Sequence, residues 1–425
     1  MAEPEPRTVS ADGELMALDR ALALLADQVT PVTGREDVSL RQALGRILAE
    51  DVVAPGDVPG HDNAAVDGYA VFFDDLEATG ETRLPVTARI AAGHPLGRAA
   101  RPGEALQVFT GAPLPAGPDT VFLVEDCRTD GDHVILGNAG GSGAIRRGAN
   151  RRQAGEDIRA GATVLRAGRR LRAQEVGLAA SVGRARLRVF EPLRAAVFST
   201  GDEVRDPATG EGLARGCIYD SNRYSVIALL EGLGCEVTDL GILGDRLDIV
   251  RDALAEAARE HPLLITTGGV SMGEEDHVRT AVEALGRIHF WRLAIKPGRP
   301  LAFGEVGGAT FLGLPGNPVA VMVTFMRIAR PVIILLSGGC DITPPLYKVR
   351  AGFDFRAKKP GRREWLRARL IADAAGPIAE KFAAQGSGIL TSMVEADGLV
   401  ELSEDQGPLV KGTLVDFLPF NEVTR

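Results

Sequence analysis

The feature that most constrains the fold is a regular alternation of strand and helix patterns, which begins near residue 194. The predicted strands are 195–199, 235–240 and 263–266, and the helices that follow them are 222–233, 247–259 and 278–285. This alternation is typical of βαβ units, which build a parallel sheet with helices on both faces. Ligands of such sheets bind at the carboxyl ends of the strands. We therefore expect a doubly wound α/β domain with its site in loops 199–203, 241–245 and 266–276.

The segment PLLITTGGVSMGEED (262–276) places a glycine-rich turn directly after the third predicted strand. Backbone N–H groups in such a turn, with a helix start near 271–273, suit a phosphate or another oxyanion. The next three residues are all acidic: Glu274, Glu275 and Asp276. Their carboxylates would repel an anion unless a divalent cation lay between them and the anion. The segment thus predicts a metal-bridged, phosphate-bearing substrate. The alternative is a simple turn before a helix whose first turn carries acids.

The rest of the chain predicts further domains, because 425 residues exceed what one core normally serves. Amphipathic spacing predicts a helix over 14–29, and Ser39 would cap a second helix, Ser39–Leu48. Short β-type runs between about 59 and 152 indicate a small, mostly-β domain. Residues 153–192 return to mixed patterns and would pack on the N-terminal helices, which makes the β domain an insertion. The region after residue 343 predicts a barrel or sandwich.

Composition and targeting signals narrow the class of protein. A net charge of −9 argues against a general nucleic-acid binder. The four cysteines are scattered without metal-ligand spacing, as expected of thiols in a reducing compartment. The N-terminus lacks the apolar core of a signal peptide. The apolar segment 317–337 contains Arg327, Arg330 and Pro331, so we expect a buried helix, no membrane association and a cytoplasmic location.

Several common chemistries are not supported. The chain has no G-x-x-x-x-G-K-[ST] motif for a P-loop, and no G-x-G-x-x-G follows a strand. It also lacks the G-x-S-x-G of a serine hydrolase, and its six histidines are isolated.

Four other segments combine turn formers with reactive side chains. FSTGDEV (198–204) ends a strand, and IYDSNR (218–223) places Asp220 at a helix start, where simple N-capping is the alternative. RLAIKPGRP (292–300) would carry Arg292 and Lys296 on one face of a strand, with a further arginine after the turn. GLPGNPVA (313–320) brackets a tight turn, with Asn317 as a helix N-cap. In the β domain, turn-rich segments surround Asp67 (59–70) and Thr110 (109–117), where solvated loops are the alternative.

Taken together, these segments resemble the MoeA family of molybdopterin molybdenumtransferases, which includes the gephyrin E domain. The resembling motifs, in chain order, are PGHDNAAVDGYA, FTGAPLP, RRQAGEDI, FSTGDEV, IYDSNR, TTGGVSMGEEDH, WRLAIKPGRP and GLPGNPVA. The resemblance implies four domains: a discontinuous elongated dimerisation domain (10–60 and 153–192), an inserted β domain (61–152), a molybdopterin-binding α/β domain (193–342) and a C-terminal β-barrel (343–425). It also implies a homodimer whose cleft lies between one subunit's α/β domain and the other's β domain.

The reaction implied by the resemblance is molybdenum insertion, in which adenylylated molybdopterin and molybdate give molybdenum cofactor and AMP with Mg²⁺. The acids at the matching positions would hold the metal: Glu203, Asp245, Asp276 and, across the dimer, Asp67. Lys296, with Arg292 and Arg299, would hold molybdate or the terminal phosphate. The pterin and its phosphates would lie against Thr200, Asp220, Asn222, Gly268, Gly269, Ser271, Gly273, Pro315, Gly316, Asn317 and Pro318. Three residues of the neighbouring domains are also expected to contact the substrate: Thr110, Asp157 and Ser387.

The sequence departs from the family pattern where arginine occupies positions 292 and 299, which are often lysine. The charge is kept, but a planar fork replaces a point charge. Two alternatives stay open. One is molybdopterin adenylyltransferase, which resembles residues 193–342 but would need neither the β domain nor the barrel. The other is a non-catalytic molybdopterin-binding scaffold. Transient contact with other enzymes of the cofactor is also expected.

Overall fold

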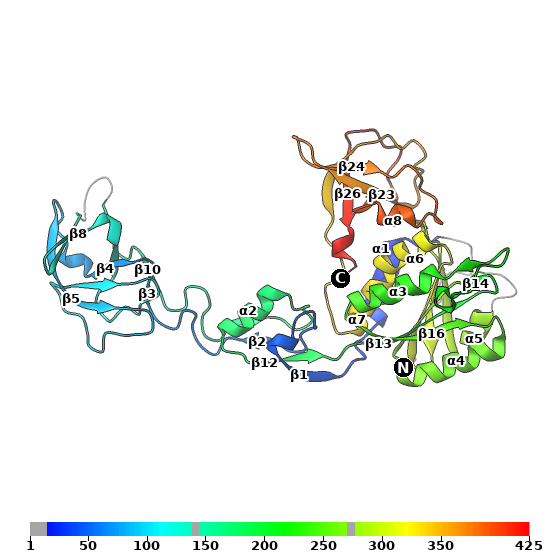
Figure 1. Ribbon diagram of the computed structural model, residues 1–425, viewed down its shortest axis with the longest axis horizontal. Coiled ribbons are helices and arrows are strands. Elements are labelled where there is room, and N and C mark those ends of the chain that lie inside the picture. Colours follow the sequence, from blue (N-terminus) through cyan, green and yellow to red (C-terminus); the bar gives the residue numbers. More distant parts are fainter. Residues whose placement is uncertain (1–14, 138–143, 270–276, 425) are drawn as a thin grey trace, which may run out of the picture. The chain divides into compact units, whose positions relative to one another are not determined.

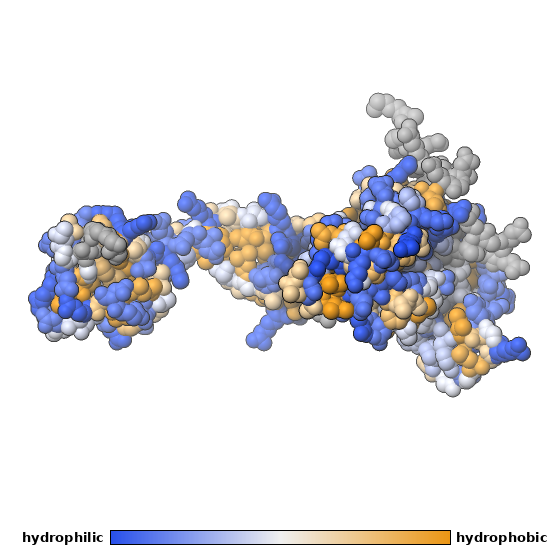
Figure 2. All heavy atoms as spheres, turned by 90° about the horizontal axis from the view of Figure 1, so that it is seen from above, coloured by the Kyte–Doolittle hydropathy of each residue, from blue (hydrophilic) through white to orange (hydrophobic). Residues whose placement is uncertain are grey.

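The computed structural model describes residues 15–137, 144–269 and 277–424, and the chain separates into two compact units. Unit 1 comprises residues 1–49, 167–171 and 188–425, and unit 2 comprises residues 50–166 and 172–187 (Figure 1). Each unit is described by itself, and the division into four domains stays a prediction. Figure 2 shows hydrophilic residues over much of the visible surface of each unit, interspersed with apolar patches.

A six-stranded sheet forms the centre of unit 1. Its order is β16 (Glu236–Leu243), β13 (Arg194–Thr200), β17 (Leu263–Thr267), β21 (Ala309–Leu314), β20 (Pro300–Val306) and β18 (Gly286–Arg292). The first four strands are parallel, and β20 and β18 join in antiparallel fashion. The predicted alternation of strands and helices is confirmed, and the antiparallel pair makes the sheet mixed.

Helices cover both faces of this sheet (Figure 1). One layer contains α3 (Ser221–Gly232) and the helical run from Pro318 to Leu336, on which α1 (Leu18–Gln28) packs. The other layer contains α4 (Leu247–Glu260) and α5 (His277–Leu285). Strand β13 shows why both layers form, because its side chains alternate between two apolar cores. Ala195 and Val197 belong to the first core, whereas Ala196 and Phe198 belong to the second.

The helical run is made of α6 (Pro318–Thr324), the π-helical turn η5 (Phe325–Ala329) and α7 (Arg330–Leu336). The wide turn precedes Pro331, which lacks an N–H and could not continue regular α-helical bonding. This run is long and apolar enough to cross a membrane by length and composition, but 83% of it is buried inside the protein. The prediction of a buried core helix is therefore confirmed.

The C-terminal part of unit 1 is a closed five-stranded barrel. Its strands are β22 (Tyr347–Ala351), β23 (Arg363–Ile371), β24 (Ile378–Lys381), β25 (Gly398–Leu402) and β26 (Leu414–Pro419). They pair in the ring β23–β24–β22–β26–β25, and β25 closes it by pairing with β23. The expected barrel is thus confirmed. A short strand from the α/β domain, β19 (Ile295–Lys296), adds to β23 from outside the ring.

Unit 2 is mostly β, as predicted. Its main sheet has the order β7 (Thr120–Leu123), β4 (Gly68–Val71), β6 (Ala105–Val108), β5 (Thr82–Ile90), β9 (His133–Leu136) and β8 (Arg128–Asp130). Two small pairs accompany it: β3 (Asn63–Ala64) with β10 (Arg151–Arg152), and β2 (Val52–Val53) with β11 (Thr163–Leu165). The helix α2 (Ala173–Ser181) completes the unit.

The predicted helix Ser39–Leu48 is wrong. Only the 3-10 turn η1 (Leu40–Gln42) forms after strand β1 (Arg35–Ser39), although Ser39 does cap it through Gln42. Gly45 then adopts a positive φ of 78°, which a right-handed helix does not allow. Its N–H donates to the carbonyl oxygen of Leu171 instead. This segment therefore forms a 3-10 turn followed by isolated bridges to long-range partners, Ile47 with Arg170 and Leu48 with Val189.

Candidate functional site

The strand order of the α/β sheet reverses between β13 and β17, and this point faces a set of glycine-rich loops. The chain runs from β13 outward to β16 and then back to β17 on the other side of β13. The parallel register aligns the ends, because Thr200 pairs with Leu243 and Ser199 pairs with Thr267. Such a reversal is where open α/β sheets bind ligands. We call residues 200–203, 244–245 and 268–269 the switch-point loops.

Close packing at this point brings three predicted residues together. Gly268 and Gly269 have positive φ values of 83° and 63°. A Cβ atom added at Gly269 would lie 2.5 Å from Thr200 Oγ1, and one at Gly268 would lie 3.2 Å from Thr200 O. The turn can therefore approach Thr200 only because it lacks side chains. Ser271, Gly273 and Asp276 lie outside the described residues.

The two predicted metal-binding acids of this edge lie in neighbouring loops. Glu203 and Asp245 are both exposed. The Glu203 carboxylate folds over Gly201, where an added Cβ atom would come within 2.6 Å of its Oε2. In the described parts of the chain, no three His, Cys, Asp or Glu side chains are grouped as a metal site. The predicted fourth acid, Asp67, belongs to unit 2.

The buried Asp220 carboxylate is hydrogen-bonded to another residue of the protein. It caps α3 by accepting from Arg223 N at 3.1 Å and from Arg223 Nε at 3.0 Å. The buried Arg223 also pairs with Asp206 and Asp239. Burial alone would lower the pKa of Arg223, but hydrogen bonds to Asp239 and Asp220 raise it above its ordinary value. The N-capping interpretation of Asp220 therefore describes its geometry.

Asn222, two residues further along, connects α3 to the turn at 315–317. Its Nδ2 donates to the carbonyl oxygen of Gly316 at 2.8 Å. Its Oδ1 is buried without a hydrogen-bond partner. A buried polar atom without a partner is costly, so it would be satisfied by a donor on a ligand.

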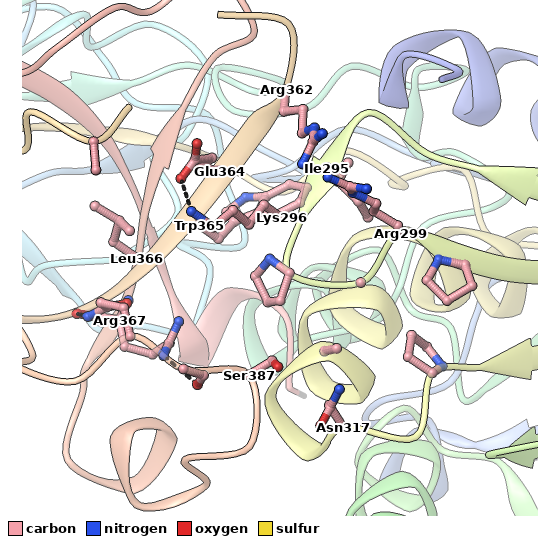
Figure 3. A pocket seen from close by; sticks show the side chains of 18 of the residues that line it. Ile295, Lys296, Arg299, Asn317, Arg362, Glu364, Trp365, Leu366, Arg367 and Ser387 are labelled. Carbon is pink, nitrogen blue, oxygen red and sulfur yellow. Dashed lines mark hydrogen bonds and ion pairs between the residues drawn. The ribbon is translucent and has the colours of Figure 1, made fainter. Parts of the chain in front are cut away.

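A pocket of about 610 Å³ lies between the α/β domain and the barrel of unit 1 (Figure 3). We call it the barrel pocket. The α/β domain contributes residues 295–300, 315–317 and Ala320, and the barrel contributes Phe355, Ala357, 362, 364–367 and 385–387. It brings together Lys296, Arg299, Pro315, Gly316, Asn317 and Ser387 from the predicted set. Asn317 occupies the N-cap position of α6 without a side-chain cap bond.

Four cationic side chains line the barrel pocket: Lys296, Arg299, Arg362 and Arg367. Lys296 Nζ lies 3.2 Å from Glu364 Oε2, as the dashed line in Figure 3 marks. The Arg367 side chain is only 1% exposed and donates to Ser392 Oγ at 2.9 Å and Gly386 O at 3.0 Å. Within the described chain it has no carboxylate in salt-bridge distance, and burial lowers the pKa of Arg367 to about 10. A buried guanidinium without a counter-ion favours an anionic ligand.

Sequence reasoning missed Arg362, Glu364 and Arg367, and it placed Arg292 wrongly. Arg292 and Lys296 do not share one strand: Arg292 ends β18 of the α/β sheet, whereas Lys296 belongs to β19 beside the barrel. The chain leaves one sheet for another between them, so strand alternation cannot place them on one face. Arg292 is exposed and does not line the pocket. The only sequence signal for Arg367 was an arginine inside an apolar strand pattern, which is typical of a solvent-facing position.

In unit 2, the structure brings together Asp67 and Thr110. The Thr110 N–H donates to Asp67 Oδ1 at 2.7 Å, and its hydroxyl donates to the same oxygen at 2.8 Å. These hydrogen bonds, the backbone one first, lower the pKa of Asp67. Asp157 is exposed, and its N–H donates to Val58 O at 3.0 Å.

The strand order, its switch-point loops and the cationic pocket beside a closed barrel define an α/β protein whose candidate site suits anionic ligands. Family models match three successive regions: "MoeA N-terminal region (domain I and II)" over residues 16–183, "Probable molybdopterin binding domain" over 196–334 and "MoeA C-terminal region (domain IV)" over 348–420. The chain therefore belongs to the MoeA family.

Relatives and solved structures agree with this assignment. A molybdopterin molybdenumtransferase of Haemophilus influenzae is 36% identical over 411 residues, covering 96% of this chain and all of that protein. A Mycobacterium tuberculosis protein named molybdopterin molybdenumtransferase 2 is 34% identical over 93% of this chain and 96% of its own length. The crystal structure of a molybdopterin biosynthesis MoeA protein from Pyrococcus horikoshii has a TM-score of 0.80 at 28% identity, covering 96% of this chain and all of that one.

Proposed function

We propose that this protein is a molybdopterin molybdenumtransferase, which inserts molybdenum from molybdate into adenylylated molybdopterin and releases AMP with Mg²⁺. The observation that carries the proposal is the barrel pocket, in which a buried, uncompensated Arg367 joins three further cations. Molybdate is a tetrahedral dianion, and planar guanidinium forks suit such oxyanions. Relatives that match nearly the whole chain bear the same name.

The switch-point loops suit the other substrate, adenylylated molybdopterin. Bare backbone N–H groups at Gly268–Gly269, beside Thr200, suit the phosphates of a pterin nucleotide. The 315–317 turn connects these loops to the barrel pocket. The Gly268 N–H donates to the carbonyl oxygen of Leu314, directly before the turn, and Asn222 Nδ2 donates to that of Gly316, which lines the pocket. The orphaned Asn222 Oδ1 would then accept from a donor on the pterin.

The exposed carboxylates fit a hard divalent cation, which prefers oxygen ligands and often keeps waters. Glu203, Asp245 and Asp276 would hold Mg²⁺ together with Asp67, whose Oδ1 is fixed by Thr110. When bound, Mg²⁺ would neutralise the charge of the pyrophosphate linkage. Lys296 and Arg299 would orient molybdate, Ser387 would donate to it, and Thr110 and Asp157 would shape the outer wall of the cleft.

The test mixes purified protein, adenylylated molybdopterin, Mg²⁺ and molybdate and measures AMP and molybdenum cofactor. AMP release that requires both the oxyanion and Mg²⁺ is the expected result. AMP release at the same rate without molybdate would contradict the proposal. Formation of adenylylated molybdopterin from ATP would instead favour adenylyltransferase activity, against which the presence of unit 2 and the barrel already speaks.

We also propose a cytoplasmic homodimer in which Asp67 of one subunit completes the other subunit's site. Two inactive variants, Asp67→Asn and Glu203→Gln, provide a sharp test. In mixed dimers of the two, one site would carry neither change, so mixing should restore part of the activity. Mixing that restores nothing, in a preparation shown to exchange subunits, would contradict the shared site. A non-catalytic scaffold would show no activity in any combination. Transient contact with other enzymes of the cofactor would need a separate binding measurement.

A further inference from the structure

Glu364 is an acidic side chain in a pocket that otherwise suits anions. Four cations line the barrel pocket, and Glu364 is the one acid among the described residues that line it. Its side chain is only 5% exposed. A buried carboxylate beside an anion site repels the ligand, so its presence calls for a physical reason.

The backbone holds Glu364 in place. Strand β19 pairs in parallel with β23, and the register sets Lys296 opposite Glu364. The Arg363 N–H donates to Ala294 O at 2.8 Å, which fastens the two strands beside this pair. Side chains at partnered positions lie next to each other on one face. The Glu364 side chain is buried at this position, with 5% of it exposed, whereas the Lys296 side chain is 56% exposed and has room to reach toward a ligand.

A second ammonium group lies near Glu364. Lys358 is 2% exposed, and its Nζ donates to Lys359 O at 2.9 Å and Arg362 O at 2.6 Å. Burial lowers the pKa of Lys358, and the Glu364 charge opposes that shift. The positive charge of Lys358 therefore acts on Glu364 from inside the barrel, independently of where the Lys296 side chain lies.

We propose that Glu364 is a specificity-determining residue that limits the affinity of the barrel pocket for tetrahedral oxyanions. It competes with the oxyanion for Lys296 and adds a fixed negative charge to the pocket wall. Ordinary dianions such as sulfate then bind weakly and leave, and the pocket stays open to an oxyanion that gains further contacts from the bound pterin. The inference rests on the proposed function for its class of ligand.

The experiment is calorimetric titration of the full-length protein with molybdate and, separately, with sulfate at constant ionic strength. Glu364→Gln removes the charge but keeps the shape and an acceptor for Lys296. We expect its Kd for both anions to fall about tenfold, because a like charge has left the pocket. Glu364→Asp keeps the charge and should stay close to the wild type. Asp416→Asn, which breaks the exposed Lys348–Asp416 pair elsewhere on the barrel, is the matched control.

The outcomes separate this inference from the proposed function. A wild-type protein that binds neither anion contradicts the oxyanion pocket itself. Wild-type binding together with an unchanged or higher Kd for Glu364→Gln overturns the role of Glu364 and leaves the proposed function intact. If thermal unfolding shows that Glu364→Gln does not fold, Glu364→Met, which removes the charge at a similar side-chain volume, takes its place. Its Kd for both anions should also fall about tenfold, and an unchanged or higher Kd would overturn the inference.

Discussion

The switch-point loops and the barrel pocket both suit anions, but they do so by opposite means. The loops offer backbone N–H groups at Gly268–Gly269 and carry exposed carboxylates, Glu203 and Asp245. The pocket offers four cationic side chains, one of them buried with no carboxylate of the described residues in salt-bridge distance. A chain with a net charge of −9 has no general attraction for anions, so each region must create a local one. Acids suit a phosphate that arrives with a metal, whereas guanidinium groups suit a bare oxyanion.

The largest expected effect comes from Arg367, because it is the most buried cation of the pocket. Arg367→Met should raise the Kd for molybdate by about 100-fold, since a desolvated charge pair is lost. Affinity for molybdopterin alone should change little, because that ligand depends on the switch-point loops. Calorimetry with each ligand measures both. Arg367→Lys keeps the charge but not the fork that reaches Ser392 and Gly386, and should be intermediate. An unchanged molybdate Kd would remove the distinction between the two regions.

The opposite result is expected for the acids of the switch-point loops. Glu203→Gln and Asp245→Asn should each raise the Mg²⁺ concentration needed for half-maximal AMP release by about 10- to 100-fold. Their Kd for molybdate should match that of the wild type. Asp252→Asn, which alters an exposed acid on α4, is the control. If these variants lost molybdate affinity instead, the two regions would form one electrostatic site.

The sequence alone predicts one of these regions much better than the other, for a physical reason. The strand–helix alternation after residue 194 and its glycine-rich turn are local patterns, and they correctly placed Thr200, Gly268 and Gly269 at one edge of the sheet. The barrel pocket depends on pairings distant in sequence, such as β19 with β23 and Arg367 with Ser392. No local period encodes these contacts.

The same reason explains the two wrong predictions. Ser39 is a favourable helix N-cap, but the Gly45 N–H donates to the carbonyl oxygen of Leu171, more than a hundred residues away. Arg292 and Lys296 were placed on one strand because nothing local marks where the chain leaves one sheet for another. The roles of the acids in the metal site stay a prediction.

Glycine substitutions distinguish a backbone site from a side-chain site. Gly269→Ala would place its Cβ atom 2.5 Å from Thr200 Oγ1 and 2.9 Å from Val278 Cγ2, at a positive φ. We expect a loss of about 2 kcal/mol in unfolding free energy and weaker molybdopterin binding. Gly316→Ala meets nothing within 4 Å and should leave stability nearly unchanged, although Gly316 lines the barrel pocket. Denaturant titration measures both, and equal losses would show that the two turns do not differ in this way.

The smallest expected effect concerns Glu104, a buried carboxylate of the protein itself that is bound both by a guanidinium group and by a backbone N–H. In unit 2, the buried Glu104 accepts from the Arg98 guanidinium at 2.7 and 2.9 Å and from the Arg101 N–H at 2.7 Å. The Arg98 hydrogen bond is the largest cause that lowers the pKa of Glu104, to about 2, and burial opposes it. Because the folded pKa lies below the ordinary 4.5, the stabilisation is present above pH 4.5 and is lost as the pH falls toward 2.

Arg98→Met removes the guanidinium donor and leaves the Arg101 N–H and the Thr87 hydroxyl in place as donors to Glu104. The unfolding free energy of unit 2 at pH 7 should fall by about 1 kcal/mol, and acid unfolding should begin at a higher pH. Denaturant titrations at pH 7, 4 and 3, followed by amide exchange within unit 2, measure both changes. Arg83→Met, which breaks an exposed pair with Asp130 in the same unit, is the control and should change neither. If Arg98→Met behaved like this control, the Arg101 N–H and the Thr87 hydroxyl would suffice to hold a buried carboxylate here without a cation, and the contrast between the two anion sites would be one of degree.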